Sequence, residues 1–408
     1  MKIIFAFPYR GAGGVSTLFG RIHRDLCILY KESAEYFILD YSDGFLSNII
    51  SKENCIEYFD DKPVRVPDNS IIWFQSSTTF RLLRNLDGKN LRCVFWNLHP
   101  LNTMTNIPKI TNYLVQNPFS ILSSLVFKTT FYRNSLVVLP RYLIRNNGLY
   151  FMDTDNLSFA RKFIGPIDEG LMLPVYFKNE KNEISFLRGK ACENNCLEII
   201  WIGRLCDFKY YPLKKFISDL TACKNYKGIN LTIIGDGEFR TDLEAFSTSL
   251  ADIRLSVKYM GEVSYAELKN FLHINYFDFA VAMGTSVLEP INALIPTLIV
   301  DYEYKQIENN NYNWVRADNI MYIGMWRPFN TVKKYQDLNQ ALFDLPEVNK
   351  QIGVIQTAIN EYYGESVLAK ILTISANTRC KYEELQVQRF VSKYDWLYKL
   401  FNFFKKIF

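Results

Sequence analysis

Two stretches in the second half of the chain decide the fold: IIWIGRL at residues 199–205 and LTIIGDGEF at residues 231–239. Each is a short apolar run that ends in a glycine turn and leads into an amphipathic segment of helix length. Apolar runs without alternation are typical of strands that are buried on both faces of a parallel sheet. The two stretches therefore predict successive β–α units.

The same alternation extends over most of the chain. Helix-length segments lie between the apolar runs, for example at 211–223, 239–250 and 265–271. This order predicts the α/β fold class, with helices on both faces of parallel sheets. The predicted strands are 2–7, 35–40, 70–74, 92–97, 135–139 and 149–153 in the first half, and 197–202, 230–234, 255–260, 276–282 and 296–301 in the second.

The chain length, 408 residues, suits two domains of roughly 150 to 200 residues each. The polar run at 178–195 is the best interdomain linker in the sequence. We expect two doubly wound, Rossmann-like domains facing a cleft, with a ligand at the carboxyl ends of the strands. The expected divisions are a first domain at 1–178, a linker at 179–196, a second domain at 197–375, and C-terminal helices at 376–408 that cross back to the first domain or associate with a membrane.

The composition excludes several protein classes. Apolar residues make up 49% of the chain and charged residues 22%, which excludes a disordered or fibrous protein. No apolar stretch is long enough to span a membrane, and the one after Met1 is too short for a signal peptide, so we expect a cytoplasmic protein. The eight cysteines are scattered, and no histidine lies near the closest pair, Cys192 and Cys196, so we expect neither a metal site nor a disulfide framework.

Glycines follow the first predicted strand, at Gly11, Gly13 and Gly14. At the start of a helix, glycines let backbone N–H groups approach a phosphate. The dinucleotide fingerprint is not matched, because Ser16 stands where its last glycine would be. Tight-turn packing explains these glycines about as well as ligand binding does.

Further candidate ligand groups follow two strands of the second half. Gly203 and Arg204 end one strand and Lys209 follows shortly after; two cations and a glycine at a strand end suit a diphosphate. The alternative is that the two cations pair with Asp207 or Asp236 on the surface. After the strand that ends near residue 282, Thr285 and Ser286 suit a helix N-cap and Glu289 suits the first turn of that helix.

The order of these motifs resembles the donor-binding half of family 4 glycosyltransferases of the GT-B fold. The matching stretches are GRL at 203–205 with Lys209, IIGDGE at 233–238, YMGEV at 259–263 and GTSVLEPINALIPT at 284–297. The glycine loop at 11–14 and His99 resemble the N-terminal half of that family. The resemblance covers residues 197–301 well and is thin elsewhere.

The resemblance implies a role for each matching residue. Arg204 and Lys209 would bind the donor diphosphate and stabilise it as it leaves, and His99 would lie near the donor sugar and the acceptor. Val281 stands where the family usually has a first glutamate, so the sugar contacts would come from the loop at 284–286. The implied donor-binding residues are Gly13, Gly14, Gly203, Gly235, Glu238, Gly284, Thr285, Ser286 and Glu289.

The expected function is transfer of a sugar from a nucleotide-sugar donor to a lipid-linked saccharide acceptor in cell-surface polysaccharide synthesis, of the capsule or O-antigen type. The resemblance implies a retaining, metal-independent enzyme without a cofactor. Asp153 and Asp155 form a DxD sequence, which we interpret as a turn at a strand end. Two alternatives are a catalytically silent GT-B binding or scaffold protein and a nucleotide-sugar epimerase; three histidines in the chain disfavour the epimerase.

Charge and amphipathicity predict an anionic membrane surface as a partner, and we expect no nucleic-acid partner. Residues 81–145 contain nine basic residues against one acid, Asp87. At 100° per residue, the tail at 394–408 (YDWLYKLFNFFKKIF) separates a polar stripe from an aromatic and aliphatic face. The alternative for the basic stretch is a solvated face without a partner. We expect peripheral binding at the inner face of the cell membrane, or else a tail helix that docks on the first domain.

Overall fold

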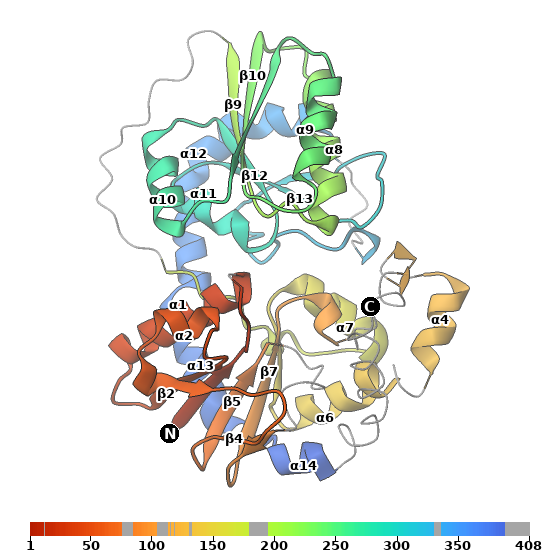
Figure 1. The fold of residues 1–408 in the computed structure, drawn as a ribbon. Coiled ribbons are helices and arrows are strands. Elements are labelled where there is room, and N and C mark those ends of the chain that lie inside the picture. Colours follow the sequence, from red (N-terminus) through yellow and green to blue (C-terminus); the bar gives the residue numbers. More distant parts are fainter. Residues whose placement is uncertain are drawn as a thin grey trace. The chain divides into compact units, whose positions relative to one another are not determined.

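The computed structural model describes residues 1–11, 13–75, 85–103, 113–114, 116–117, 119–129, 133–178, 195–329 and 336–387. The chain divides into two compact units. Unit 1 comprises Met1–Tyr176 and the chain from Glu365 onward, and unit 2 comprises Phe177–Gly364. Each unit contains its own parallel sheet (Figure 1), which confirms the expected α/β class with one Rossmann-like unit in each half.

The sheet of unit 1 has six parallel strands in the order β3-β2-β1-β5-β7-β8. The chain winds outward in one direction from β1 and in the other from β5, so the order reverses between these neighbours. A small two-stranded sheet pairs β4 (Val64–Arg65) with β6 (Leu86–Asp87). The strands of the main sheet are β1 (Lys2–Ala6), β2 (Glu35–Asp40), β3 (Cys55–Glu57), β5 (Ser70–Phe74), β7 (Arg92–Asn97) and β8 (Leu149–Phe151).

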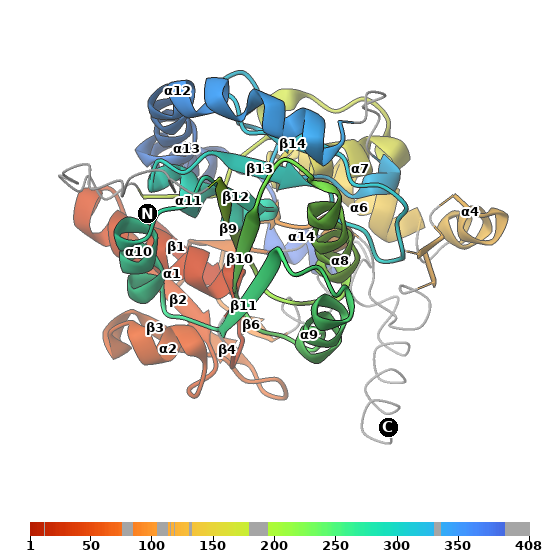
Figure 2. The same ribbon diagram turned by 90° about the horizontal axis from the view of Figure 1, so that it is seen from above.

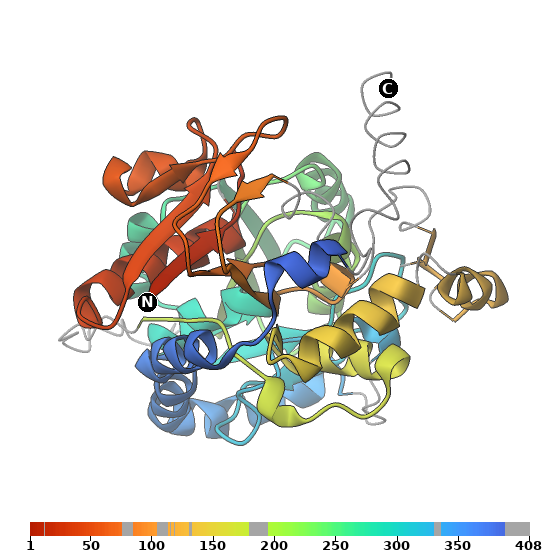
Figure 3. The same ribbon diagram turned by 90° about the horizontal axis from the view of Figure 1, so that it is seen from below.

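Helices cover both faces of this sheet (Figure 3). On one face, Phe19 of α1 packs against Phe5 and Trp96, and Trp73 Nε1 donates to Ser375 Oγ of α13 at 2.9 Å. On the other face, a core cluster joins Ile4, Ile72 and Phe95 to side chains of α6, α7 and α14. The helices of unit 1 are α1 (Gly14–Leu29), α2 (Phe45–Ile49), α4 (Ile121–Lys128), α6 (Leu139–Arg145), α7 (Thr154–Ile164), α13 (Glu365–Asn377) and α14 (Tyr382–Val387), with short turns η1 (Lys52–Asn54), η2 (Pro100–Thr103), η3 (Asn134–Val138) and η4 (Glu169–Leu171).

The chain re-enters unit 1 at Glu365, earlier than the division expected at residue 376. The break falls at Gly364, which separates α12 (Leu338–Tyr363) from α13. After α13, the backbone N–H of Cys93 donates to the carbonyl of Cys380 at 2.8 Å, so the returning segment extends the hydrogen bonding of β7. The predicted tail helix at 394–408 lies outside the described residues.

The expected strand at 135–139 is wrong, because this segment is helical in η3 and α6. Leu136, Leu139 and Leu143 are buried, whereas Val138 is 41% exposed. Spacings of three and four residues place the three leucines on one face of a helix. Pro140 lies in the first turn of α6, where its missing N–H costs little.

The sheet of unit 2 has the order β11-β10-β9-β12-β13-β14, and only β14 is antiparallel to its neighbour. The winding reverses between β9 and β12. The strands are β9 (Cys196–Ile202), β10 (Gly228–Ile234), β11 (Leu255–Gly261), β12 (Phe279–Ala282), β13 (Thr297–Val300) and β14 (Tyr312–Trp314).

Figure 2 shows α8 and α9 on the opposite side of this sheet from α10 and α11. Ile200 and Ile202 of β9 pack with Leu272 of α10 in a buried cluster. The helices are α8 (Asp207–Ala222), α9 (Arg240–Ser249), α10 (Tyr265–Ile274), α11 (Leu288–Asn292) and α12 (Leu338–Tyr363), with short turns η5 (Gly284–Val287) and η6 (Arg327–Phe329). Within the described residues, no helix is long and apolar enough to cross a membrane.

Asp40, at the end of β2, fixes the loops around the carboxyl end of the unit 1 sheet. Its fully buried carboxylate accepts hydrogen bonds from the backbone N–H groups of Tyr9, Tyr41, Leu46 and Ser47. These bonds tie the loop after β1 to the start of α2.

The substitution Asp40→Asn is expected to lower the free energy of unfolding by about 3 kcal/mol, because an amide has one acceptor oxygen and would direct N–H groups at backbone N–H donors. Urea unfolding measures this loss. The control Asp43→Asn removes an exposed carboxylate that pairs with Arg10 at 2.8 Å and should change stability by less than about 1 kcal/mol. Equal losses in the two variants would show that the buried bonds of Asp40 contribute little.

Candidate functional site

Each unit has a switch point in its sheet, between β1 and β5 in unit 1 and between β9 and β12 in unit 2. In open α/β sheets, ligands bind beyond the carboxyl ends of the strands at such points. In unit 2, Gly203 and Arg204 follow β9, and Gly284 follows β12 after one residue. Gly203, Arg204 and Gly284 therefore flank the switch point of this unit, whereas Gly235 and Glu238 follow the neighbouring strand β10.

The loops after β9, β10 and β11 pack backbone against backbone. The N–H of Gly203 donates to the carbonyl of Ile234, and the N–H of Gly235 donates to that of Gly261, each at 2.9 Å. Gly235 has a φ of +133°, and a Cβ at this position would lie 2.2 Å from the carbonyl oxygen of Gly203. Only glycine fits there, so Gly235 holds the Gly203 loop in position.

Lys209 lies in the first turn of α8 with only 9% of its surface exposed. Its Nζ reaches back to the end of β9, since a Cβ added to Gly203 would lie 2.7 Å from that nitrogen. Among the described residues, none forms a hydrogen bond or an ion pair with Lys209 Nζ. Burial is the main cause that lowers the pKa of Lys209 to about 8; Cys206 opposes the shift, and the nearby Arg204 charge contributes to it. A desolvated ammonium without a carboxylate suits an anionic ligand.

The alternative surface pairing of these cations is not found. Asp236 instead pairs with Arg240 at 3.1 Å, and Asp207 Oδ1 accepts from the backbone N–H of Phe208 at 2.8 Å. Arg204 is exposed and forms no ion pair with a described residue. The structure thus brings two cations together, and neither has a carboxylate partner among the described residues.

The loop after β12 differs from the expected helix cap. Gly284, with φ of +65°, donates its N–H to the carbonyl of Ile323 at 2.6 Å and starts η5. Neither Thr285 nor Ser286 caps a helix: the cap residues of η5 and α11 are Met283 and Val287, and neither helix has a side-chain cap. The prediction of a side-chain cap was therefore wrong, and both hydroxyl groups remain available to a ligand.

Unit 2 also contains two acids of the predicted site and the valine that stands in place of the family's first glutamate. Glu289 is half-buried in the first turn of α11, and Glu238 is exposed in the loop after β10. Val281 is fully buried inside β12, where it pairs with Trp201 and Leu298. The side chain at this position lies within the sheet core rather than in the loop after β12.

In unit 1, the glycine loop leads directly into α1. Gly13 is the N-cap of α1; its N–H donates to Ser16 Oγ, and that hydroxyl donates to the carbonyl of Gly13, both at 3.0 Å. A Cβ on Gly14 would meet no atom within 4 Å, and the first turn of α1 contains no acidic residue. Hydrogen bonds with Ser16 therefore explain the conformation at Gly13, and no close contact requires a glycine at position 14.

His99 follows β7 and is half-buried. Its Nδ1 accepts a hydrogen bond from the backbone N–H of Leu101 at 3.1 Å, so the ring proton resides on Nε2. Burial lowers the pKa of His99 to about 4. At neutral pH the ring can donate a hydrogen bond from Nε2 but carries no charge.

The lowered pKa predicts a pH dependence of stability. Because the pKa of His99 is about 4 in the folded state and about 6.5 in the unfolded state, the unfolded chain binds more protons between these values. This contribution to stability is present above pH 6.5 and is lost as the pH falls towards 4. The variant His99→Gln should lose less stability than wild type between pH 7 and pH 4.5 in urea unfolding; identical losses would contradict the assigned pKa.

Asp153 and Asp155 occupy a helix start. Asp153 is the N-cap of α7 and accepts from Asn156 N and Nδ2 at 2.9 and 2.7 Å, and burial raises its pKa. The DxD sequence therefore forms the start of a helix, with Asp155 in the first turn of α7, rather than a turn at a strand end. Within the described part of the chain, no group of three His, Cys, Asp or Glu side chains could hold a metal ion.

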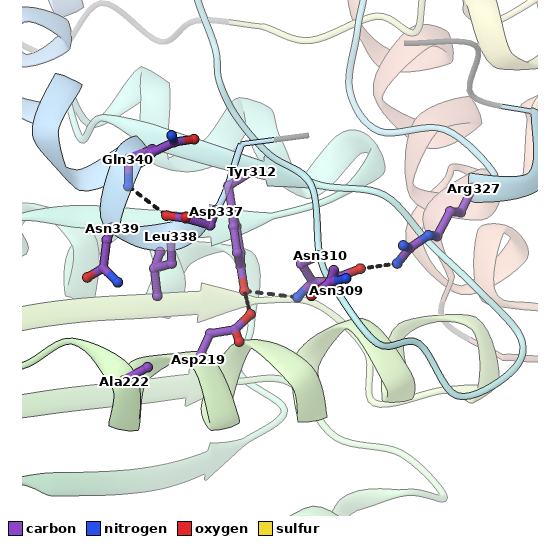
Figure 4. Close-up of a pocket in the computed structure, with 10 residues that line it drawn as sticks. All are labelled: Asp219, Ala222, Asn309, Asn310, Tyr312, Arg327, Asp337, Leu338, Asn339 and Gln340. Carbon is purple, nitrogen blue, oxygen red and sulfur yellow. Dashed lines mark hydrogen bonds between the residues drawn. The ribbon is translucent and has the colours of Figure 1, made fainter. Parts of the chain in front are cut away.

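A separate pocket of about 700 Å³ lies on the flank of unit 2 (Figure 4). Tyr312 donates to Asp219 Oδ2 at 2.6 Å, and Asn310 Nδ2 donates to the Tyr312 hydroxyl at 3.0 Å. Asp337 caps α12 by accepting from Gln340 N at 2.8 Å. None of the predicted site residues lines this pocket, and its hydrogen bonds join α8 to β14 and to the segment before that strand.

Comparison with solved structures gives matches over nearly the whole chain, whereas protein families and curated proteins give none. Alr3699/HepE from Anabaena in complex with UDP matches with a TM-score of 0.54 and 14% identity, over 92% of this chain and 100% of that chain. Sucrose-phosphate synthase from Thermosynechococcus elongatus matches with a TM-score of 0.56 and 9% identity, over 91% of this chain and 97% of that chain. The chain has the GT-B fold.

Proposed function

We propose that this protein is a glycosyltransferase that uses a nucleotide-sugar donor. The observation that carries the proposal is the buried ammonium of Lys209, which lies beside Arg204 at the switch point of unit 2 and has no carboxylate among the described residues. A diphosphate supplies the missing negative charge. The binding of UDP by the structurally similar HepE supports a nucleotide ligand in this fold.

In this proposal, the two cations act on the leaving group. The acceptor hydroxyl oxygen forms a bond to the anomeric carbon while the bond between that carbon and the diphosphate oxygen breaks. The electron pair of the broken bond leaves with the diphosphate, which develops negative charge and can take up the proton of the acceptor hydroxyl. Arg204 and Lys209, fixed before the reaction, stabilise that charge at little reorganisation cost. The protein cations thereby perform the role that a metal ion has in other transferases, so we propose a metal-independent reaction.

The remaining donor contacts follow the family resemblance. We assign Glu289 to the ribose hydroxyls and the loop around Glu238 to the base. The hydroxyl groups of Thr285 and Ser286, with the backbone of Gly203 and Gly284, would contact the sugar and phosphates. Family 4 membership and a retaining outcome are parts of the same proposal.

Unit 1 would bind the acceptor. We assign the Nε2–H of His99 to the side of the donor sugar and the acceptor. We assign the open backbone at Gly13 and Gly14 to the donor phosphates. A lipid-linked saccharide at the inner face of the cell membrane, in cell-surface polysaccharide synthesis, is the acceptor that we propose. The amphipathic sequence at 394–408 supports this location.

A second candidate is a binding protein without activity. It is favoured by Val281, because a buried valine in β12 replaces the family's first glutamate and leaves the sugar without that carboxylate. Such a protein would bind nucleotide sugars but would neither transfer nor hydrolyse them.

Calorimetric titration with UDP-, GDP- and dTDP-sugars tests the proposal, with the free nucleosides as controls. We expect one diphosphate nucleotide to bind and its nucleoside to bind far more weakly. Turnover with lipid-linked saccharides, with and without EDTA, then separates the candidates. Binding without turnover would favour the binding protein, loss of turnover in EDTA would contradict metal independence, and no nucleotide binding would overturn the proposal.

A further inference from the structure

The helix α4 of unit 1 has an inverted distribution of polar and apolar side chains. Ser123 is fully buried, and its hydroxyl donates to the carbonyl of Asn117 at 2.6 Å. Ile121, Leu122 and Leu125 are 83%, 52% and 57% exposed. A helix that packs only onto its own domain buries leucine and exposes serine. The exposed face of α4 is therefore made for contact with something outside this unit.

The attachment of α4 to unit 1 uses the opposite side of the helix. Phe127 packs against Phe163 of α7 with ring centroids 5.0 Å apart. At 100° per residue, Ser123 and Phe127 lie on one side of the helix and Ile121 and Leu125 on the other. Figures 1 and 3 both show α4 at the periphery of unit 1. The outward apolar stripe thus belongs to a helix whose opposite side packs against α7.

A second apolar side chain adjoins this stripe. Phe119, 62% exposed, precedes the N-cap residue Ser120, which accepts a hydrogen bond from the N–H of Ser123 at 3.1 Å. Lys162 Nζ lies 3.6 Å from the centroid of the Phe119 ring. We call Phe119, Ile121, Leu122 and Leu125 the α4 patch. An aromatic ring and a lysine at the edge of an aliphatic surface are typical of a membrane interface.

The charges around the α4 patch indicate what kind of surface would bind there. Lys128, Arg133 and Lys162 are exposed in the same part of unit 1. Between residues 113 and 164, the only acidic residues are Asp153 and Asp155, and both are buried. The nearest exposed acids along the chain, Asp168 and Glu169, follow α7, and Glu169 pairs with Arg161 at 3.6 Å. Within residues 113–164 the apolar stripe thus has exposed basic residues and no exposed acid, which matches a surface that is apolar beneath a layer of negative charge.

We propose that the α4 patch inserts into an anionic lipid bilayer. The apolar side chains enter the boundary between headgroups and acyl chains, and the basic residues remain at the phosphate level. The helix is far too short to span, so it lies in the plane of the interface. This proposal specifies the membrane surface of unit 1 and does not rest on sugar transfer.

The test compares variants of the full chain in sedimentation with phosphatidylglycerol vesicles and with phosphatidylcholine vesicles. The triple variant I121S/L122S/L125S removes the apolar stripe from an exposed face, so folding should be preserved. The matched control I253S/I274S removes two side chains of unit 2 that are 101% and 70% exposed. We expect the triple variant to bind phosphatidylglycerol vesicles at least about tenfold more weakly and the control to bind like wild type.

Hydrogen exchange resolved by segment separates α4 from the tail at 394–408. On addition of phosphatidylglycerol vesicles, amides of residues 121–128 should exchange more slowly in wild type and unchanged in the triple variant. Vesicle binding without slower exchange in α4 would overturn the proposal. So would a loss of self-association, rather than of vesicle binding, in the triple variant, because the patch would then be an interface between two copies. Nucleotide binding by the triple variant, measured separately, should equal that of wild type.

Discussion

Replacing Lys209 with methionine is expected to lower glycosyl transfer by about 100-fold while leaving the protein as stable as wild type or more stable. The loss follows from removing one preorganised cation from the departing diphosphate. The stability follows from the burial of the ammonium, because its desolvation is not offset by a carboxylate among the described residues. Methionine fills similar volume without charge. Turnover and urea unfolding of the same preparations measure both effects.

Two further variants make this result specific. Arg204→Ala should also lose about 100-fold in turnover, and the double variant should lose less than the product of the two losses, because both cations act on one diphosphate. Lys224→Ala removes an exposed lysine of unit 2 and should leave turnover unchanged. Wild-type turnover in a folded Lys209→Met protein would remove the main support for the diphosphate site.

The pKa of Lys209 adds a pH dependence to the same experiment. Since the pKa is about 8 in the folded protein, Lys209 loses its charge at a lower pH than it does in the unfolded chain. The stability associated with the neutral amine is present at high pH and is lost as the pH falls through about 8. Binding of a diphosphate favours the charged form, so nucleotide affinity should decrease as the pH rises above 8, and this decrease should be absent in Lys209→Met.

The sequence predicts the fold better than it predicts the environment of the site. The strands Glu35–Asp40, Ser70–Phe74 and Arg92–Asn97 have the expected bounds, because uninterrupted apolar runs between polar turns leave few alternatives. The error at 135–139 arises where an apolar run also satisfies helical spacing, and a following proline is compatible with the first turn of a helix. Local pattern thus decides the three strands, whereas at 135–139 it fits a strand and a helix equally and does not decide.

The environment of Lys209 and Gly235 depends on loops that are distant in sequence. Lys209 is buried because the ends of β9, β10 and β11 converge, which no local spacing reveals. The sequence assigned Gly235 to donor binding, whereas the structure also gives it a close backbone contact with Gly203. Likewise, Thr285 and Ser286 have good capping propensity, but a glycine with positive φ at 284 starts a tighter turn there and directs the chain away from a capped geometry.

The contact at Gly235 leads to the largest expected change in stability. The substitution Gly235→Ala should lower the free energy of unfolding by about 3 kcal/mol or more, because two costs combine. An L-residue rarely adopts a φ of +133°, and the new Cβ would lie 2.2 Å from the carbonyl oxygen of Gly203 and 3.3 Å from the backbone nitrogen of Arg204. Neither neighbour is a flexible side-chain end, so the loop after β9 must move.

The same movement should abolish nucleotide binding, because the displaced loop carries Gly203 and Arg204. Urea unfolding and calorimetric titration of Gly235→Ala measure the two consequences. The matched control is Gly353→Ala within α12, where a Cβ would meet no atom within 4 Å and alanine should stabilise the helix by roughly 0.5 to 1 kcal/mol. If Gly235→Ala were as stable as wild type and bound the nucleotide equally well, the close approach of the two loops could not be what positions the cations, and the buried state of Lys209 would need another cause.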